Sequence, residues 1–270
     1  MNTFGDRLSR HTPALFACAL VNLLLAELMI AAGLTWPSRS LAAAPTLAAT
    51  HLVTLGWLTL LMLGALFQFV PVITNRPLPS QRLVLAVLIV FETGLGLMLA
   101  GFLGIAGPAG TLLPPGGALV LVAILLALAD LLPPLWGAAH SLSARCVLVG
   151  SGALLLTAAL GICFALALRV PALAAHAGAL LGSALSAHLL AGLAGWLTLT
   201  AIGVSYKLMP MFLLAPEDRG VLGELVFAAT SAGFLLGVAA PIGYALQRSP
   251  AWLLLQTAAL ALIGVGIALY

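Results

Sequence analysis

The chain has 270 residues, of which 63% are hydrophobic and only 6% are charged, and its formal net charge is +3. Soluble domains are about 45–50% apolar and about 25% charged, so no water-soluble core of this size could hide so much apolar surface. The composition excludes a soluble globular protein and predicts one that uses the lipid bilayer as its solvent.

A membrane-spanning helix needs about 20 mostly apolar residues, and the chain holds about eight such runs in succession. We expect spans at 12–34, 47–73, 81–104, 116–138, 147–168, 185–214, 221–245 and 252–270. The fold class is therefore all-α, a polytopic transmembrane helical bundle. Residues 170–184 are apolar but too many to add to the next span, and we expect a separate interfacial or re-entrant helix there.

The lysines and arginines predict the orientation of the spans. One side of the membrane receives Arg7, Arg10, Arg76, Arg82, Arg145, Lys207 and Arg219, and the other receives Arg39, Arg169 and Arg248. Cytoplasmic loops carry the excess of basic residues. We therefore expect a multi-pass protein of a bacterial inner membrane, with both termini in the cytoplasm.

The sequence contains an internal repeat. Residues 56–72 read GWLTLLMLGALFQFVPV and residues 195–211 read GWLTLTAIGVSYKLMPM, at an offset of about 139 residues. The same offset places span one on span five, three on seven, and four on eight. This predicts a 4+4 tandem duplication whose halves have parallel topology, because four is an even number of spans. We place the repeats at 1–146 and 147–270, together forming one membrane domain.

Two histidines stand out, because polar groups inside a bilayer are costly and tend to mark function. His51 and His188 each lie near the outer start of a repeat-equivalent helix, a few residues before its Gly-Trp pair. Ala191, Gly192 and Gly195 follow His188 on its own helix face, which leaves room for a planar ligand such as a porphyrin. Imidazole is a common axial ligand of haem iron. The alternative is that both histidines hydrogen-bond a neighbouring helix.

Three carboxylates are expected within spans of the first repeat, at Glu27, Glu92 and Asp130. At the offset of 139, the second repeat has leucine or serine at the positions of Glu27 and Glu92. This asymmetry favours a use such as a proton path or a quinol site. The alternative is a protonated carboxyl group that hydrogen-bonds between helices.

The stretch HLLAGLAGWLTLTAIGVSYKLMPMF, residues 188–212, resembles the late histidine-bearing helix of haem-copper oxidase catalytic subunits. It is most similar to the cbb-type enzymes, whose pattern is H-x-H-x4-GW followed by G-x-x-Y-x-L-x-P. The matching residues are Gly195, Trp196, Gly203, Tyr206, Leu208 and Pro210. THLVTLGWLTLLMLGALFQFVPV, residues 50–72, is a second copy and also resembles the early haem-bearing helix of those subunits. The resemblance implies a shortened relative built from four-helix units, similar also to nitric-oxide-response haem membrane proteins.

The chain departs from the family at the second histidine of H-x-H, which binds the low-spin haem and is Leu190 here. In the second span, Ala49 takes the first position and His51 the second. His51 and His188 are thus out of register by two residues, about 3 Å along a helix and about 200° around it. Symmetric bis-histidine ligation does not follow, so five- and six-coordinate iron both stay open, and His176 is a reserve ligand.

The copper site of the oxidases needs three further histidines, and His11, His140 and His176 form no plausible cluster. The resemblance therefore implies haem b without copper and without copper-dependent oxygen reduction. The absence of a CxxCH motif argues against covalent c-type attachment. Arg39 and Arg169, with Arg248, lie on the outer side where haem propionates would sit, although anchoring at the interface is the more ordinary role for each.

These features predict a haem-binding membrane protein for electron transfer or for sensing or handling a diatomic gas. A quinol or a cytochrome is the expected redox partner, a homodimer is left open, and no nucleic-acid partner is expected. Two alternatives remain. One is a secondary transporter without a cofactor, since tandem repeats with midplane carboxylates are also a transporter signature. The other is an assembly partner of an oxidase.

Overall fold

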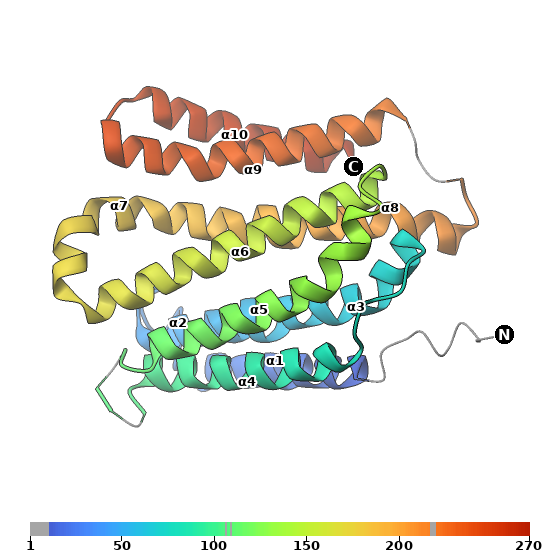
Figure 1. Cartoon of the computed structure of the whole chain (residues 1–270). Coiled ribbons are helices and arrows are strands. Elements are labelled where there is room, and N and C mark those ends of the chain that lie inside the picture. The colour runs from blue at the N-terminus through green and yellow to red at the C-terminus, as the bar shows by residue number, and fades with distance from the viewer. Residues whose placement is uncertain (1–10, 106, 109, 217–219) are drawn as a thin grey trace. The chain divides into compact units, whose positions relative to one another are not determined.

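The computed structural model describes residues 11–105, 107–108, 110–216 and 220–270, and every regular element in these ranges is a helix (Figure 1). In chain order they are α1 (Thr12–Ala31), α2 (Ala44–His51), η2 (Leu52–Thr59), α3 (Leu60–Thr74), α4 (Arg82–Leu103), α5 (Leu113–Trp136), α6 (Leu142–Arg169), α7 (Pro171–Leu190), η3 (Ala191–Thr198), α8 (Leu199–Leu213), α9 (Val221–Gln247) and α10 (Ala251–Leu269). The segments η2 and η3 are π-helical.

Eight helical runs are long and apolar enough to cross a membrane. They are Thr12–Ala31, Ala44–Thr74, Arg82–Leu103, Leu113–Trp136, Leu142–Arg169, Leu180–Leu213, Val221–Gln247 and Ala251–Leu269. Helices are the expected answer in lipid, where each backbone N–H and C=O must find its partner within the protein. The all-α prediction with eight spans is confirmed.

The expectation of a separate interfacial or re-entrant helix at 170–184 is wrong. A single helix, α7, begins at Pro171 and continues to Leu190, where η3 takes over directly. Pro171 occupies the first turn, where its missing N–H costs nothing. No further proline interrupts the chain before Pro210, and alanine and leucine, which are strong helix formers, fill most of α7.

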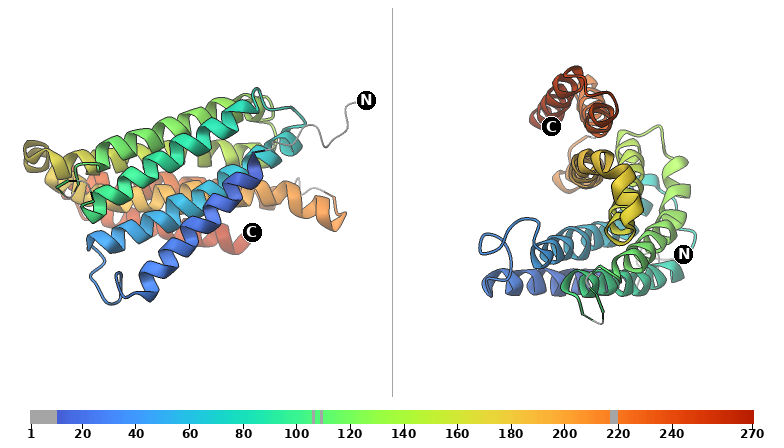
Figure 2. Two further views of the ribbon diagram at one scale, coloured as in Figure 1. Left: turned by 90° about the horizontal axis from the view of Figure 1, so that it is seen from below. Right: turned by 90° about the vertical axis from the view of Figure 1, so that its left-hand side faces the viewer.

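The chain divides into two compact units, residues 1–131 and 132–270. The division lies within α5, whereas the expected boundary between repeats is at 146/147. In the first unit, α1 packs against η2 and α3, and α2 packs against α4. Figure 2 shows α1 in dark blue beside the lighter blue rod formed by α2, η2 and α3. In the second unit, α6 packs against η3 and α8, α7 packs against α9, and α9 and α10 form a hairpin (Figure 1).

The two units repeat one contact between their first two spans. A Cβ atom added to Gly56 would lie 2.7 Å from the Cβ of Asn22, and one added to Gly195 would lie 2.5 Å from the Cβ of Ala153. The chain takes 34 residues from Asn22 to Gly56 but 42 from Ala153 to Gly195. The offset of 139 is therefore correct for the second spans and wrong for the first, where the contacts give 131. Sequence comparison missed this because eight extra residues lie between the contact positions in the second unit.

A second glycine contact repeats between the third and fourth spans of each unit. A Cβ atom on Gly94 would lie 2.8 Å from the Gly116 carbonyl oxygen, and one on Gly233 would lie 2.8 Å from the Ala259 carbonyl oxygen. The glycines are 139 residues apart, but their partners are 143 apart. Small residues let helix backbones approach closely in a membrane, where lipid offers no hydrophobic drive for association. Glycine contacts therefore define the repeat in both units.

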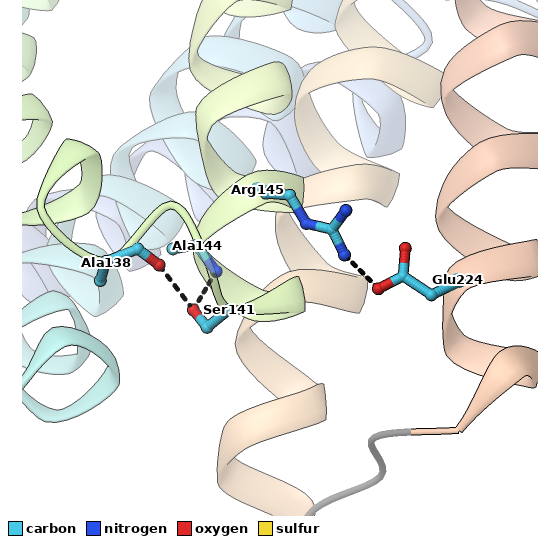
Figure 3. A network of polar contacts seen from close by, with 5 residues as sticks. All are labelled: Ala138, Ser141, Ala144, Arg145 and Glu224. Atoms are coloured by element: carbon cyan, nitrogen blue, oxygen red, sulfur yellow. Dashed lines mark hydrogen bonds and ion pairs between the residues drawn. The ribbon is translucent and has the colours of Figure 1, made fainter.

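An ion pair links α6 to α9 in the second unit, between Arg145 and Glu224 (Figure 3). Ser141 caps the start of α6, since its side chain accepts a hydrogen bond from the Ala144 N–H at 3.2 Å. This cap satisfies one of the N–H groups that a helix start leaves without a partner. The Arg145 guanidinium also lies 4.8 Å from the centre of the Phe227 ring, so α6 and α9 share a charged and an aromatic contact at this end.

Candidate functional site

His51 is the last α-helical residue before the π-helical segment η2. Its Nδ1 lies 2.8 Å from the carbonyl oxygen of Leu47, one turn earlier on α2. A carbonyl oxygen only accepts hydrogen bonds, so Nδ1 carries the hydrogen and the lone pair of the neutral ring is on Nε2. The ring is half-buried and lies against Phe102 of α4, with ring centres 5.1 Å apart. The α2–α4 contact thus holds the ring in one orientation.

His188 reaches the same tautomer by a different route. Its Nδ1 lies 3.0 Å from the carbonyl oxygen of Thr157, which belongs to the neighbouring helix α6. The Phe164 ring of α6 meets the imidazole edge-on, with ring centres 5.6 Å apart. Again the carbonyl requires a hydrogen on Nδ1 and leaves the lone pair on Nε2. Histidines that bind metals usually donate their other N–H to a carbonyl or carboxylate in this way, which fixes the ring and the tautomer.

The strip of small residues beside His188 lies against other helices of its unit. Ala191 is fully buried in a cluster with Ala153 and Phe234. A Cβ atom on Gly195 would lie 2.8 Å from the Phe234 ring, and one on Gly192 would lie 3.5 Å from Thr157. Close helix packing therefore accounts for Ala191, Gly192 and Gly195. Their predicted role beside a planar ligand adds nothing to this packing, and the case for haem stands on the histidines.

The predicted propionate partners are exposed and lie at helix ends. Arg39 lies in the connection between α1 and α2, the helix that carries His51. Arg169 ends α6, five residues after Phe164, which contacts His188. The side chain of the reserve ligand His176 lies outside the described part of the structure, as do Arg7, Arg10 and Arg219 from the topology prediction.

The π-helical segments were not predicted. They cover Leu52–Thr59 and Ala191–Thr198, which are equivalent at the offset of 139. In each, the hydroxyl of the last threonine donates to the carbonyl five residues earlier, Thr59 to Thr54 at 2.8 Å and Thr198 to Leu193 at 2.9 Å. The signal in the sequence was the repeated Gly-Trp-Leu-Thr. Single π-helical turns occur often at functional sites, because the extra residue redirects side chains.

The carboxylates occupy three different environments. Glu92, at the middle of α4, accepts a hydrogen bond from the side-chain amide of Asn22 on α1 at 2.9 Å. Asp130 is fully buried, and its Oδ1 accepts from the Ser80 N–H at 2.6 Å. Its Oδ2 has no hydrogen-bond partner in the described part of the chain. Glu27 is exposed on α1. The structure therefore does not gather these three carboxylates into one site.

The same amide of Asn22 also donates to the backbone carbonyl of Gly56 at 3.2 Å. Asn22 is 5% exposed, so this side chain is buried where α1, η2 and α4 meet. An amide NH₂ group has two donors, and here one serves each acceptor. Sequence analysis singled out Glu92 but not Asn22, because the two residues are 70 positions apart and only the packing of α1 against α4 joins them.

Within the described residues, no three His, Cys, Asp or Glu side chains lie close enough together to hold a metal ion. A haem iron differs from such a site, since the porphyrin supplies four ligands and the protein needs only one or two. The chain matches no protein-family model, and it matches no curated protein. The chemistry of this chain therefore has to be argued from its own residues.

Proposed function

We propose that the chain is an integral membrane protein that binds b-type haem, with His51 and His188 as axial ligands. Electron transfer, or sensing or handling of a diatomic gas, is the function that such a protein would serve. No copper-dependent oxygen reduction is proposed. The proposed setting is the inner membrane of a bacterium, with a quinol or a cytochrome as redox partner.

One observation carries this proposal: the Nδ1–H of each histidine donates to a backbone carbonyl, Leu47 in one case and Thr157 in the other. Both hydrogen bonds select the neutral tautomer whose Nε2 has a lone pair for iron. A backbone carbonyl cannot be lost by side-chain rotation, so both rings are held in that state. The haem would supply a one-electron iron centre that can also bind a diatomic gas.

The protein residues have distinct tasks in this proposal. Phe102 and Phe164 limit rotation of the two imidazoles, because each ring packs against its histidine. Arg39 and Arg169 are the proposed partners of the haem propionates, since both are exposed and precede or end the helices that position the histidines. A guanidinium binds a carboxylate through two parallel hydrogen bonds, which suits that task.

A transporter without a cofactor is the second candidate, and the pair formed by Glu92 and Asn22 favours it. Ionisable residues inside membrane-spanning helices commonly mark ion or proton pathways. The haem proposal does not require this pair, since it lies on different side chains from those that would bind iron. The two candidates therefore predict different results for the same purified protein.

The deciding experiment is a reduced-minus-oxidised visible spectrum of the full chain, purified from haem-supplemented cells. We expect a b-type spectrum for the wild type, and lower haem content for His51→Ala and for His188→Ala. His140→Ala is the matched control, because His140 is an exposed histidine outside the proposed site, and it should retain full haem content. A colourless wild-type protein would reject haem binding and leave the transporter.

Unchanged haem content in both alanine variants would show that other residues bind the iron, and His176 would be tested next. Carbon monoxide then reports the coordination number. Iron with two histidine ligands binds carbon monoxide poorly, whereas five-coordinate iron binds it readily and would favour gas sensing over electron transfer.

A further inference from the structure

Three helices of the first unit meet at one buried amide. Asn22 on α1 donates one N–H to the Gly56 carbonyl of η2 at 3.2 Å and the other to a carboxyl oxygen of Glu92 on α4 at 2.9 Å. Gly56 makes this possible, since any side chain at position 56 would collide with Asn22 and with Leu95. The amide and its two acceptors therefore form a built site in which the carboxyl group of Glu92 is held in place.

The second unit builds the same junction without these polar groups. Gly195 stands where Gly56 does, and it packs against Ala153 and Phe234 in place of Asn22 and Leu95. Ser231 stands where Glu92 does, and its buried hydroxyl has no hydrogen-bond partner in the described part of the chain. Since η3 forms here as η2 does in the first unit, the helix junction requires neither an amide nor a carboxyl group.

The second unit thus acts as an internal control for the first. If Glu92 and Asn22 served only to hold helices together, the apolar arrangement of the second unit would do so equally well. Placing a carboxyl group in a membrane-spanning helix costs free energy, about 2.5–3.5 kcal/mol for a charged side chain at a helix centre. A cost that the fold does not require indicates a use for the ionisable group itself.

We propose that Glu92, held by Asn22, is a proton-exchange site in the first unit. In the forward step the O–H bond of the Glu92 carboxyl group breaks and the proton passes to a water molecule, which leaves a carboxylate and a hydronium ion. The reverse step restores the acid. Asn22 donates to the same oxygen in both states, so the carboxyl group keeps its position while its charge changes.

Few other ionisable groups face this site. On α1 the nearest is the thiol of Cys18, one turn before Asn22. The segment η2 contains no ionisable side chain. On α2, His51 contacts Phe102, which is ten residues beyond Glu92 and so about 15 Å further along α4. On α5, Asp130 is held by Ser80 before the start of α4. The proton of Glu92 therefore exchanges without a neighbouring charge, and independently of any bound haem.

Infrared difference spectroscopy tests the proposal on the full chain in lipid vesicles, with buffers stepped across the pH range in which the protein stays folded. We expect a carbonyl stretching band of a protonated carboxyl group that is lost at high pH and returns at low pH. Glu92→Gln should abolish the band. Glu27→Gln is the matched control, since Glu27 is an exposed carboxylate on α1, and it should leave the band unchanged. Asn22→Ala should move the band to higher frequency, because the carbonyl loses its hydrogen bond.

A band that persists in folded Glu92→Gln, or a wild-type band that does not respond to pH, would overturn the proposal. If Glu92→Gln does not fold, wild-type protein labelled with ¹³C at the glutamate side chains takes its place. The band must then shift to lower frequency, which separates Glu92 from Asp130. A labelled band whose frequency Asn22→Ala leaves unmoved would also reject the site. These readouts need no haem, so failure of the haem proposal and failure of this one are distinguishable.

Discussion

Asn22 and Gly56 lie so close together that a single added methyl group would not fit between them. The Cβ of Asn22 would be 2.7 Å from a Cβ at position 56, and its Cγ would be 2.8 Å away. The contact brings α1 against η2 and places the Asn22 amide within reach of Glu92 on α4. One missing side chain thus determines both a helix packing distance and a polar site.

The first prediction is that Gly56→Ala destabilises the first unit. The added methyl group meets a side chain that is 95% buried on one side and Leu95 at 2.9 Å on the other, so neither neighbour has room to move. Overpacking of this kind costs about 1–3 kcal/mol. Better helix propensity returns up to about 1 kcal/mol, so the loss prevails. Denaturant titration of the protein in mixed micelles measures the free energy of unfolding.

Gly96→Ala is the matched control for this prediction. Gly96 lies on α4, and a Cβ atom there would meet nothing within 4 Å. This change should leave the free energy of unfolding unchanged or raise it by less than about 1 kcal/mol, through helix propensity alone. Equal effects of the two substitutions would contradict the close packing at position 56.

The second prediction concerns the ion pair between Arg145 and Glu224 (Figure 3). The two side chains are 31% and 55% exposed, and exposed pairs contribute about 0–1 kcal/mol. Glu224→Gln should therefore lower the free energy of unfolding by no more than about 1 kcal/mol, and less in high salt. Arg145→Gln should cost more, because it also removes the contact with the Phe227 ring.

A double-mutant cycle measures that ion pair directly. The coupling free energy between Arg145→Gln and Glu224→Gln should fall as the salt concentration rises. A coupling that does not depend on salt would mean that the pair is shielded from solvent, contrary to its exposed position.

The third prediction is the orientation of the chain. With both termini in the cytoplasm, the exposed residue Ser38 lies outside the cell, in the connection between α1 and α2. In a variant that lacks the native residues Cys18, Cys146 and Cys163, a Ser38→Cys change should react in intact cells with a thiol reagent that cannot cross the membrane. His140→Cys should react only after the cells are opened, since the connection between α5 and α6 lies inside. The reverse pattern would invert the predicted topology.

Composition and the lengths of apolar runs determined the fold class of this protein and the approximate bounds of its eight spans. These features are local, since about 20 apolar residues form a helix in lipid whatever their neighbours are. The repeated Gly-Trp-Leu-Thr motif likewise identified the second and sixth spans as equivalent. Local pattern could not reveal that α7 continues through residues 170–184, because an apolar run does not show where a helix meets the surface of the membrane.

The tertiary structure alone decided which residues of the repeats correspond and which polar groups meet. The contacts of Gly56 and Gly195 replaced the offset of 139 by 131 for the first helix of each unit, so that Glu27 corresponds to Ala158 and not to Leu166. Asn22 and Glu92 are 70 residues apart and share no motif. They form one site because two helices pack face to face, and which faces meet depends on the fit of side chains from both helices, a property that neither segment carries by itself.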